Sequence, residues 1–283
     1  MERKMKLSVL IVNYNGTRVL RNCLLSLEKY ITEVAHEVIV IDNLSPDQSW
    51  KSLINEFPRV QFIAAEENGG FAKANNRLAR LAKGEFILLL NPDTELEDHS
   101  IADLITFAES QDHFGCLGVR LHDLNGNFLP ESKRIVPDPL SSFKKLFLTG
   151  KKNRTSYYRT DIGEYDVAPV EVITGAFLLT RKEVYLAIGG LDEQYFMYGE
   201  DIDLCYTLLQ AGYTNWYYGK ASVLHIKGEC TVKDDVYLER FYGAMQIFVN
   251  KYYRSNRILH TVLSLGLKSR HFLARWQQKK NAR

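Results

Sequence analysis

Residues 86–98, FILLLNPDTELED, place a carboxylate directly after an apolar run. Five apolar residues precede Asn91-Pro92-Asp93, and Pro92 cannot donate the backbone hydrogen bond that would continue a strand. Asp93 is therefore expected where a buried strand ends. A carboxylate there is a hard oxygen ligand suited to Mg²⁺ or Mn²⁺, with waters and substrate phosphates as the remaining ligands. The alternative is turn chemistry, with Asp93 capping a helix that begins at Leu96.

A second group of acids opens an apolar-periodic helix after a Gly-Gly turn, in residues 189–213. The acids are Glu200, Asp201 and Asp203, and the aromatic run YFMY, which ends in Tyr198, precedes them. Acids in a first helical turn favour the helix dipole, so capping explains one or two of them. An acid at a helix start within an aromatic pocket also has the position of a general base with a raised pKa.

The elements that carry these residues alternate between strand and helix patterns. Short apolar runs at residues 7–12, 37–42, 60–64 and 85–90 predict buried parallel strands. Residues 17–30, 47–57 and 71–83 have helical patterns, so the order implies a mostly parallel α/β sheet with helices on both faces. Ligands bind beyond the carboxyl ends of such strands. Three of these strands end in polar clusters, NYNG from Asn13, DN from Asp42 and NPD from Asn91.

The second half of the chain is less regular. Residues 123–170 have little periodicity and predict a long connection over the site. Within it, Lys133-Arg134 is interpreted as a solvated charge pair, with a phosphate contact as the alternative. The run VEVITGAFLLT, residues 170–180, predicts a strand, and residues 182–188 and 200–211 predict helices. His225 ends a further apolar run, where it could ligate a metal or be a hydrogen-bonded core histidine.

Composition bounds the class of protein. The chain has 283 residues, 46% hydrophobic and 25% charged, as in globular proteins with a real core. No uncharged apolar run reaches the about 18 residues that span a membrane, and the first run is too short for a signal peptide. Four cysteines lie far apart with no C-x-x-C pair, which predicts reduced cytosolic thiols and no zinc site.

The C-terminal residues 251–283 form a basic tail. They hold nine Lys and Arg and no Asp or Glu, although the net charge of the whole chain is only +2. Their apolar residues fall largely on one predicted helical face: Ile258, Leu259, Val262, Leu263, Leu265, Phe272, Leu273 and Trp276. A basic amphipathic helix with a Trp suits an anionic membrane surface. The alternative is a helix that packs this stripe on the domain or on a second subunit.

The segments SVLIVNYNG, VIVIDNLSPDQS, ENGGFAKANN, LLLNPDTEL, ITGAFLLTRKEVYLAIGGLDEQYFMYGEDIDLCY and HIKGEC together resemble family 2 glycosyltransferases of the GT-A fold. The resemblance points to the rhamnosyltransferase-like branch of bacterial cell-surface polysaccharide biosynthesis. It covers about residues 6–255 in the right order. It implies a Rossmann-like, mostly parallel central sheet with helices on both faces, followed here by a C-terminal helical extension.

The resemblance also implies site roles for individual residues. The positions that match nucleotide-binding residues are Asn13, Tyr14, Asn15, Asp42, Asn68, Gly69 and Asn75. Asp93 matches the last acid of a D-x-D metal motif, and His225 matches a histidine that reaches the metal or the pyrophosphate. The group beside the transferred sugar and the acceptor is Asn91, Gly175, Ala176 and Tyr198. Glu200 and Asp201 match the E-D pair, with Asp201 as the catalytic base.

Three departures and absences refine this expectation. Asn91 replaces the first D-x-D acid, which leaves one strong ligand in that motif. Thr207 stands where many relatives have an Arg. No Q-x-x-R-W signature follows Asp201, which argues against a processive synthase. Asn75 and Asn76 could instead be plain helix surface, Asp42 and Asn43 could be turn chemistry only, and the two tryptophans at positions 50 and 216 are expected in the core or at its rim.

The expected protein is an inverting, non-processive glycosyltransferase that needs Mg²⁺ or Mn²⁺. Its expected partners are a nucleotide-diphosphate sugar, with rhamnose favoured, a glycan or lipid-linked acceptor, a membrane surface and a second copy of itself, but no nucleic acid. Residues 1–115 would bind the nucleotide, residues 116–250 the acceptor, and residues 251–283 the inner face of the cell membrane from the cytoplasm. The alternatives are a catalytically idle relative that binds a nucleotide sugar or glycan and, less favoured, a nucleotidyltransferase.

Overall fold

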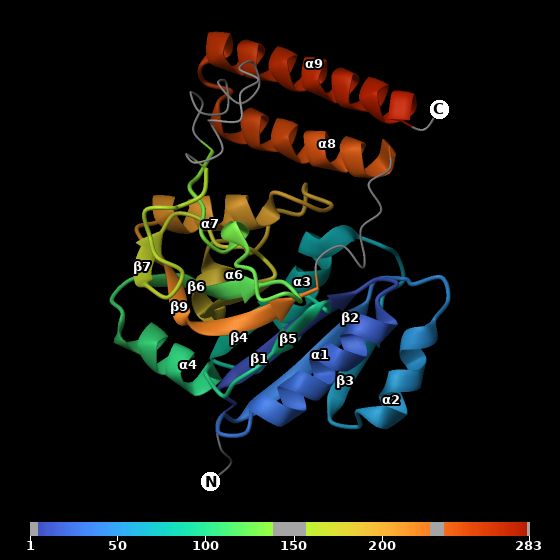
Figure 1. Cartoon of the computed structure of the whole chain (residues 1–283), viewed down its shortest axis with the longest axis vertical. Helices are drawn as coiled ribbons and strands as arrows, with labels where there is room; N and C mark the ends of the chain where they lie inside the picture. Colours follow the sequence, from blue (N-terminus) through green and yellow to red (C-terminus); the bar gives the residue numbers. More distant parts are fainter. Residues whose placement is uncertain (1–4, 138–156, 227–234, 282–283) are drawn as a thin grey trace.

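A computed structural model describes residues 5–137, 157–226 and 235–281 of the chain (Figure 1). The first four strands are parallel neighbours, as their apolar runs predict. They are β1 (Leu7–Asn13), β2 (His36–Asp42), β3 (Val60–Ala64) and β4 (Phe86–Leu90). Every residue of β1 and β4 is buried, which is why these strands are apolar throughout instead of alternating.

The helices between these strands confirm the predicted alternation. They are α1 (Thr17–Tyr30), the 3₁₀ turn η1 (Ser49–Ser52), α2 (Leu53–Glu56) and α3 (Gly70–Leu81). The helix predicted at 47–57 is thus a 3₁₀ turn followed by one α-helical turn. Because strand and helix alternate along the chain, the carboxyl ends of β1, β2 and β4 meet at one edge of the sheet.

The remaining strands extend the sheet in mixed directions. They are β5 (Thr94–Leu96), β6 (Phe114–His122), β7 (Val167–Val170), β8 (Phe177–Arg181) and β9 (Thr214–His225). The strand order is β3-β2-β1-β4-β8-β6-β9-β5, with β7 beside β9. Strand β8 is antiparallel to β4 and β6, while β6 and β9 are parallel. The further helical elements are α4 (Ile101–Ser110), η2 (Pro130–Ser132), α6 (Lys182–Ala187) and α7 (Glu200–Gln210).

Two sequence expectations fail in this region. Residues 94–96 form strand β5, so the alternative of a helix that begins at Leu96 is wrong, and the next helix begins at Ile101. The single strand predicted for residues 170–180 is also wrong, because β7 ends at Val170 and β8 begins at Phe177. In the intervening turn, the Ile173 carbonyl and the Gly175 N–H bond side chains rather than a neighbouring strand.

Two apolar clusters hold helices on the two faces of the sheet. Residues of α1, α2 and α4 pack on one face, and residues of α3, α6 and α7 pack on the other. This arrangement confirms the predicted layers, and it leaves the strand ends at the edge to polar side chains. Each fully buried Leu or Ile of these clusters contributes about 1.5–3 kcal/mol.

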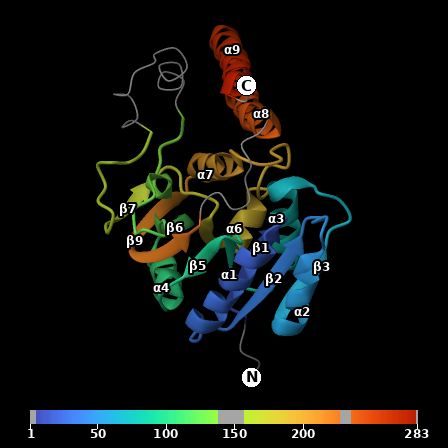
Figure 2. The ribbon, with the colours of Figure 1, turned by 45° about the vertical axis from the view of Figure 1, so that its right-hand side comes forward.

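The C-terminal helices α8 (Asp235–Tyr252) and α9 (Arg257–Asn281) lie side by side above α7 in both views (Figures 1 and 2). Val249 of α8 and Leu263 and Leu267 of α9 are buried where the two helices meet. Part of the predicted apolar stripe therefore packs on protein. The rest stays exposed: Ile258, Leu265, Phe272, Leu273 and Trp276. Among the described residues, no helix has the length and apolarity to cross a membrane.

Candidate active site

Two polar side chains meet where β1 and β2 end. Asn13 and Asp42 are paired residues of the parallel strands, and Asn13 Nδ2 donates to Asp42 Oδ1 at 2.7 Å. The Asp42 carboxylate also accepts from the backbone N–H and the hydroxyl of Ser45, at 2.8 and 2.6 Å. Asp42 therefore closes the turn after β2. Asn13 Oδ1 is buried without a hydrogen-bond partner among the described residues, which makes it available to a ligand at this edge.

The turn after β1 gives Asn15 an unusual backbone. Asn15 has φ 55°, in the left-handed region that Asn tolerates better than most residues, and its N–H donates to Ser45 Oγ at 2.8 Å. Tyr14 before it is 41% exposed. The side chains of Asn13, Tyr14 and Asn15 thus lie at the same strand end, as predicted, with Tyr14 open to solvent.

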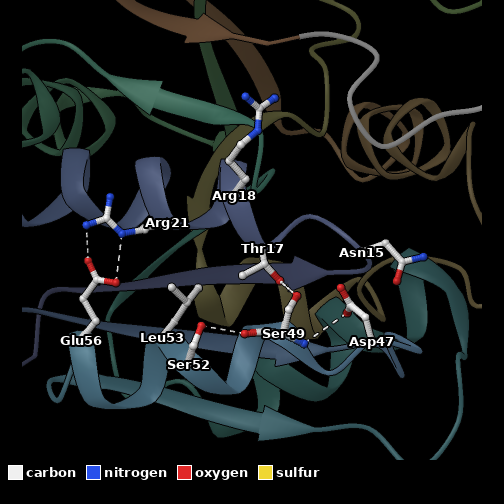
Figure 3. Close-up of a pocket in the computed structure, with 9 residues that line it drawn as sticks. All are labelled: Asn15, Thr17, Arg18, Arg21, Asp47, Ser49, Ser52, Leu53 and Glu56. Atoms are coloured by element: carbon white, nitrogen blue, oxygen red, sulfur yellow. Dashed lines mark hydrogen bonds and ion pairs between the residues drawn. The ribbon is translucent and has the colours of Figure 1, made fainter.

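A surface pocket of about 590 Å³ adjoins Asn15, between α1 and the η1–α2 segment (Figure 3). Its polar groups largely bond one another. Arg21 pairs with Glu56 at one end, and the hydroxyls of Thr17 and Ser49 lie 2.5 Å apart at its centre. The pocket lies beside the strand-end turn and contains none of the acids discussed below. We assign it no separate role.

The loop before α3 and its first turns are packed against neighbouring elements. Asn43 Nδ2 donates to Asn68 Oδ1 at 2.9 Å, and Gly69 immediately precedes the helix. Asn75 and Asn76 are only 1% and 4% exposed, so the helix-surface alternative is wrong. Asn76 bonds the loop that follows α6. Asn75 Oδ1 is buried with no partner in the part of the chain that the structure describes, as for the Asn13 oxygen.

Asp93 and His225 are brought together by strand pairing. Thr94 of β5 pairs with His225 of β9, and the Ile226 N–H donates to the Asp93 carbonyl at 2.8 Å. Both residues are 8% exposed, and His225 Nε2 lies 3.4 Å from Asp93 Oδ1. That distance is long for a hydrogen bond. Asp93 Oδ1 and His225 Nδ1 have no hydrogen-bond partner among the described residues, so the core-histidine alternative gains no support.

This pair fits a divalent cation. Carboxylate and imidazole are both ligands of Mn²⁺, and two protein ligands suffice when a substrate diphosphate and waters supply the rest. The orphaned Asp93 Oδ1 is a buried atom that an ion held between the two side chains would satisfy. Within the described residues no group of three or more His, Cys, Asp or Glu side chains gathers for a metal.

Two short contacts connect this edge to the acids of α7. The Asn91 N–H donates to the Ala176 carbonyl at 3.0 Å, and the Gly175 N–H donates to Asp201 Oδ2 at 3.2 Å. Asn91 precedes Asp93 by two residues, and Gly175 and Ala176 are adjacent. Asn91, Gly175, Ala176 and Asp201 are therefore joined by one run of contacts. The turn between β7 and β8 lies in the middle of this run.

The first two acids of α7 have different surroundings. Glu200 is 7% exposed, and its Oε2 has no partner among the described residues. Burial and the adjacent Asp201 charge raise the pKa of Glu200 from 4.5 to about 8. Asp201 instead accepts three hydrogen bonds, from Arg134, Gly175 and the Ile202 N–H. Glu200 is therefore protonated at neutral pH, and Asp201 is the member of the pair that accepts the hydrogen bonds.

The third acid, Asp203, anchors the C-terminal helices. Lys251 Nζ lies 2.8 Å from Asp203 Oδ2, and the Tyr252 hydroxyl donates to Asp203 Oδ1 at 2.7 Å. Asp203 is 2% exposed, so its charge depends on these partners. Thr207, one turn later, also lies within 3.4 Å of the Tyr252 hydroxyl. Asp203, which the sequence suggests as a helix cap, and Thr207, which stands where many relatives have an Arg, therefore both contact α8.

Tyr198 lies in an aromatic cluster that α8 completes. Its ring centroid lies 5.4 Å from that of Tyr237 and 6.3 Å from that of Phe241. Tyr198 has φ 72°, a left-handed conformation that is strained for an aromatic residue.

At Gly70, φ is 83° and a Cβ atom would lie 2.3 Å from the Phe196 carbonyl oxygen, so only glycine fits where the loop that contains Phe196 crosses the start of α3.

Arg134 and Lys133 are the residues that sequence reasoning misjudged. They are only 8% and 4% exposed, so the solvated charge pair is wrong. Lys133 Nζ donates to the Gly163 carbonyl at 2.9 Å, and Arg134 Nη2 lies 2.6 Å from Asp201 Oδ2. A buried charge needs such partners because burial removes its water. Two adjacent charges in an aperiodic segment carry no local signal that distinguishes burial from solvation.

Comparison with known proteins decides the family. Residues 8–187 match the model of the family described as glycosyl transferase family 2. The chain belongs to this family. An N-acetylglucosaminyl-diphospho-decaprenol L-rhamnosyltransferase of Mycobacterium tuberculosis is 31% identical over 242 residues, which cover 81% of this chain and 78% of that protein. The rhamnosyltransferase WbbL of Escherichia coli K12 is 28% identical, over 66% of this chain and 71% of its own length.

Solved structures agree on the fold. The mannosyltransferase PcManGT from Pyrobaculum calidifontis was solved in complex with GDP-Man and Mn²⁺. It superposes on this chain with a TM-score of 0.59, and the match covers 94% of this chain and 70% of PcManGT. At 13% identity this likeness shows the fold alone. The mostly parallel sheet, its two helix layers and the C-terminal helices are the GT-A architecture that the sequence predicted.

Proposed function

We propose that this family 2 glycosyltransferase is an inverting, non-processive enzyme that moves a sugar, rhamnose in the first instance, from a nucleoside-diphosphate sugar to a glycan or lipid-linked acceptor of cell-surface polysaccharide. The observation that carries the proposal is a run of two contacts, Asn91–Ala176 and Gly175–Asp201. They link the strand end that bears Asp93 and His225 to Asp201. The names of the mycobacterial and E. coli relatives support rhamnose and, for the first, a lipid-linked acceptor.

The donor would lie along the strand ends. Its nucleoside would meet Asn13, Tyr14, Asn15 and the turn that Asp42 closes, while Asn68, Gly69 and Asn75 would line the side toward the phosphates. The buried, unpartnered oxygens of Asn13 and Asn75 support this placement, because each offers an acceptor to a ligand.

Asp93 and His225 would hold Mg²⁺ or Mn²⁺ at the diphosphate. Such an ion neutralises the charge that develops on the leaving diphosphate as the glycosidic bond breaks. The orphaned Asp93 Oδ1 beside His225 Nε2 supports this role, and so does the Mn²⁺ in the PcManGT complex with its nucleotide sugar. Asn91, in place of a second acid, would contribute its backbone to the turn that positions Asp93.

The acceptor would bind on the side of Tyr198, Gly175 and Ala176. Asp201 would take the proton of the attacking hydroxyl while that oxygen forms its bond to the anomeric carbon and the diphosphate departs with the bonding electron pair. A single displacement inverts the anomeric configuration. Glu200, protonated beside it, would keep a second negative charge out of the site.

The tail would attach the protein to the inner face of the cell membrane. The support is its nine basic residues without an acid and the apolar side chains of α9 that stay exposed in the structure. Each Lys or Arg near an anionic surface contributes about 1 kcal/mol. In this proposal residues 1–250 form the catalytic domain, with the nucleotide half ending near 115, and 251–283 form the tail, although α8 runs across that boundary.

The alternative is an idle relative that binds a nucleotide sugar or glycan without transfer. One experiment separates the two. We expect purified protein with Mn²⁺ and deoxythymidine-diphosphate rhamnose to release the nucleotide, slowly with water and faster with a polyprenyl-diphosphate sugar acceptor. Asp201→Asn should lower turnover by about 10²–10⁴-fold with donor affinity retained, since a base acts only in the transition state. Donor binding without release by the wild-type protein would establish the idle relative.

A further inference from the structure

Arg134 reaches the base of the proposed reaction from the connection between β6 and β7. Its backbone is fixed by two hydrogen bonds with Val172, from the Arg134 N–H at 2.8 Å and to the Arg134 carbonyl at 3.0 Å. Its guanidinium donates through Nη2 to the Ile173 carbonyl at 2.7 Å and to Asp201 Oδ2 at 2.6 Å. Hydrogen bonds therefore fix both the backbone and the guanidinium of Arg134, and they keep the guanidinium beside Asp201.

The hydrogen bonds of Asp201 divide its two oxygens. Oδ2 accepts both from Arg134 and from the Gly175 N–H, while Oδ1 accepts only the Ile202 N–H at 2.8 Å among the described residues. A carboxylate oxygen offers about two lone-pair sites. Oδ2 is thus fully used, and Oδ1 retains a lone pair for a proton.

Arg134 is also a buried cation beside both acids of the pair. Glu200 and Asp201 are adjacent carboxyls, and two like charges in one site push one proton onto the pair. Burial opposes the Arg134 charge, but the Asp201 carboxylate more than offsets this, so the pKa of Arg134 lies above its ordinary value. The remaining titratable groups facing this centre are Tyr157, whose hydroxyl lies 3.3 Å from Arg134 Nη1, and the Cys205 thiol.

We propose that Arg134 is the positioning residue of the base: it holds Asp201 by Oδ2 and directs Oδ1 to the acceptor hydroxyl. In the transfer, the acceptor O–H bond breaks and its proton goes to Oδ1. The acceptor oxygen bonds the anomeric carbon, whose bond to the diphosphate breaks with the electron pair leaving on the nucleotide. This inference rests on the proposed role of Asp201.

The first test needs no substrate. The free energies of unfolding of wild type, Arg134→Gln, Asp201→Asn and the double variant form a thermodynamic cycle. We expect the two changes to be coupled by at least tenfold in the unfolding constant. A control cycle of Arg159→Gln with Asp161→Asn, a surface pair at 2.7 Å in the same connection, should show much weaker coupling. Coupling in the Arg134 cycle no larger than in this control would overturn the pairing.

The second test is steady-state turnover with deoxythymidine-diphosphate rhamnose, Mn²⁺ and acceptor. Because a positioned base acts only in the transition state, Arg134→Gln should lower kcat by at least tenfold, with the KM for donor little changed. Arg134→Lys keeps the charge without the planar fork, so it should restore only part of kcat, and it serves as the second variant if Gln prevents folding.

The outcomes separate this inference from the proposed function. If Asp201→Asn retains turnover, the base assignment fails and the role of Arg134 fails with it. If Asp201→Asn is inactive while Arg134→Gln keeps the wild-type kcat, only the role of Arg134 is overturned. If the wild-type protein turns over no donor, the proposed function fails, and the unfolding cycle still decides whether Arg134 holds Asp201.

Discussion

Replacing Glu200 with Gln should stabilise the protein in a pH-dependent way. The Glu200 side chain is buried at the first turn of α7, with Oε2 unpartnered among the described residues and the Asp201 charge beside it. Burial and that charge raise the pKa of Glu200 from 4.5 to about 8. Gln has nearly the same shape and cannot ionise, so it removes the penalty of ionising a buried carboxyl while leaving the packing in place.

The direction of the effect follows from proton linkage. Between pH 4.5 and about 8 the folded chain keeps a proton on Glu200 that the unfolded chain has lost. The folded state binds more protons in this window, so stability falls as the pH rises and becomes level above about 8. At about 1.4 kcal/mol per pH unit, the full difference corresponds to about 5 kcal/mol. Since water entry hydrates part of the ionised carboxylate, we expect to measure about 2–5 kcal/mol.

The assay is urea unfolding of wild type and Glu200→Gln at intervals from pH 4.5 to 9. The difference between the two free energies isolates Glu200 from the other titrating groups. A matched control is Glu183→Gln, because Glu183 also lies in the first turn of a helix, α6, but is exposed. Its difference from wild type should stay nearly constant across the range.

Two results would refute this reasoning. The first is a wild-type-minus-variant difference that does not change with pH. The second is a Gln variant that is less stable than wild type above pH 8, which would mean that the ionised carboxylate is favoured by a partner. In either case Glu200 would not be the protonated member of the pair, and the different roles given to Glu200 and Asp201 would lose their support.

Three other predictions follow from separate parts of the structure. Among the described residues Asp93 supplies the carboxylate of the proposed metal site, so Asp93→Ala should weaken metal-dependent donor binding at least tenfold in titrations with and without Mn²⁺; an unchanged metal dependence would place the ion elsewhere. Lys251→Met leaves the buried Asp203 charge with fewer partners, which should lower the free energy of unfolding by about 1–3 kcal/mol in urea titrations, and Asp203→Asn in addition should recover part of that loss. Truncation after Ser255 should abolish flotation with anionic liposomes and leave behaviour with neutral ones unchanged; equal flotation of both chains would exclude the tail as the membrane contact.

The nucleotide half of the fold follows closely from the sequence. Strands β1 to β4 and helices α1 and α3 lie within a residue or two of their predicted ranges, because each is a local pattern with its own period. Asp42 and Asp93 could be placed at strand ends for the same reason. The buried Trp50, stacked on Phe62, also fits the prediction of a core residue.

The second half depends on contacts between distant residues, which local patterns do not specify. Arg134 and Asp201 are separated by 67 positions, and Lys251 and Asp203 by 48. In each pair, a charged residue that the sequence suggests to be solvated or to cap a helix is buried by an element from elsewhere in the chain. The site roles carried over by resemblance, the predicted dimer and the membrane contact stay predictions. The part of the long connection between residues 138 and 156 lies outside the described residues.

Helix α7 carries the proposed base at its second residue and the anchor of α8 two residues later. Because one rigid turn joins them, a pull on the tail acts on Asp203 and is transmitted to Asp201 as a small displacement. Displacements of about 1 Å can cost 10²-fold in rate. Turnover should therefore respond to mechanical load at the C-terminus, and a molecule tethered by its tail would report the tension on that tether through its rate.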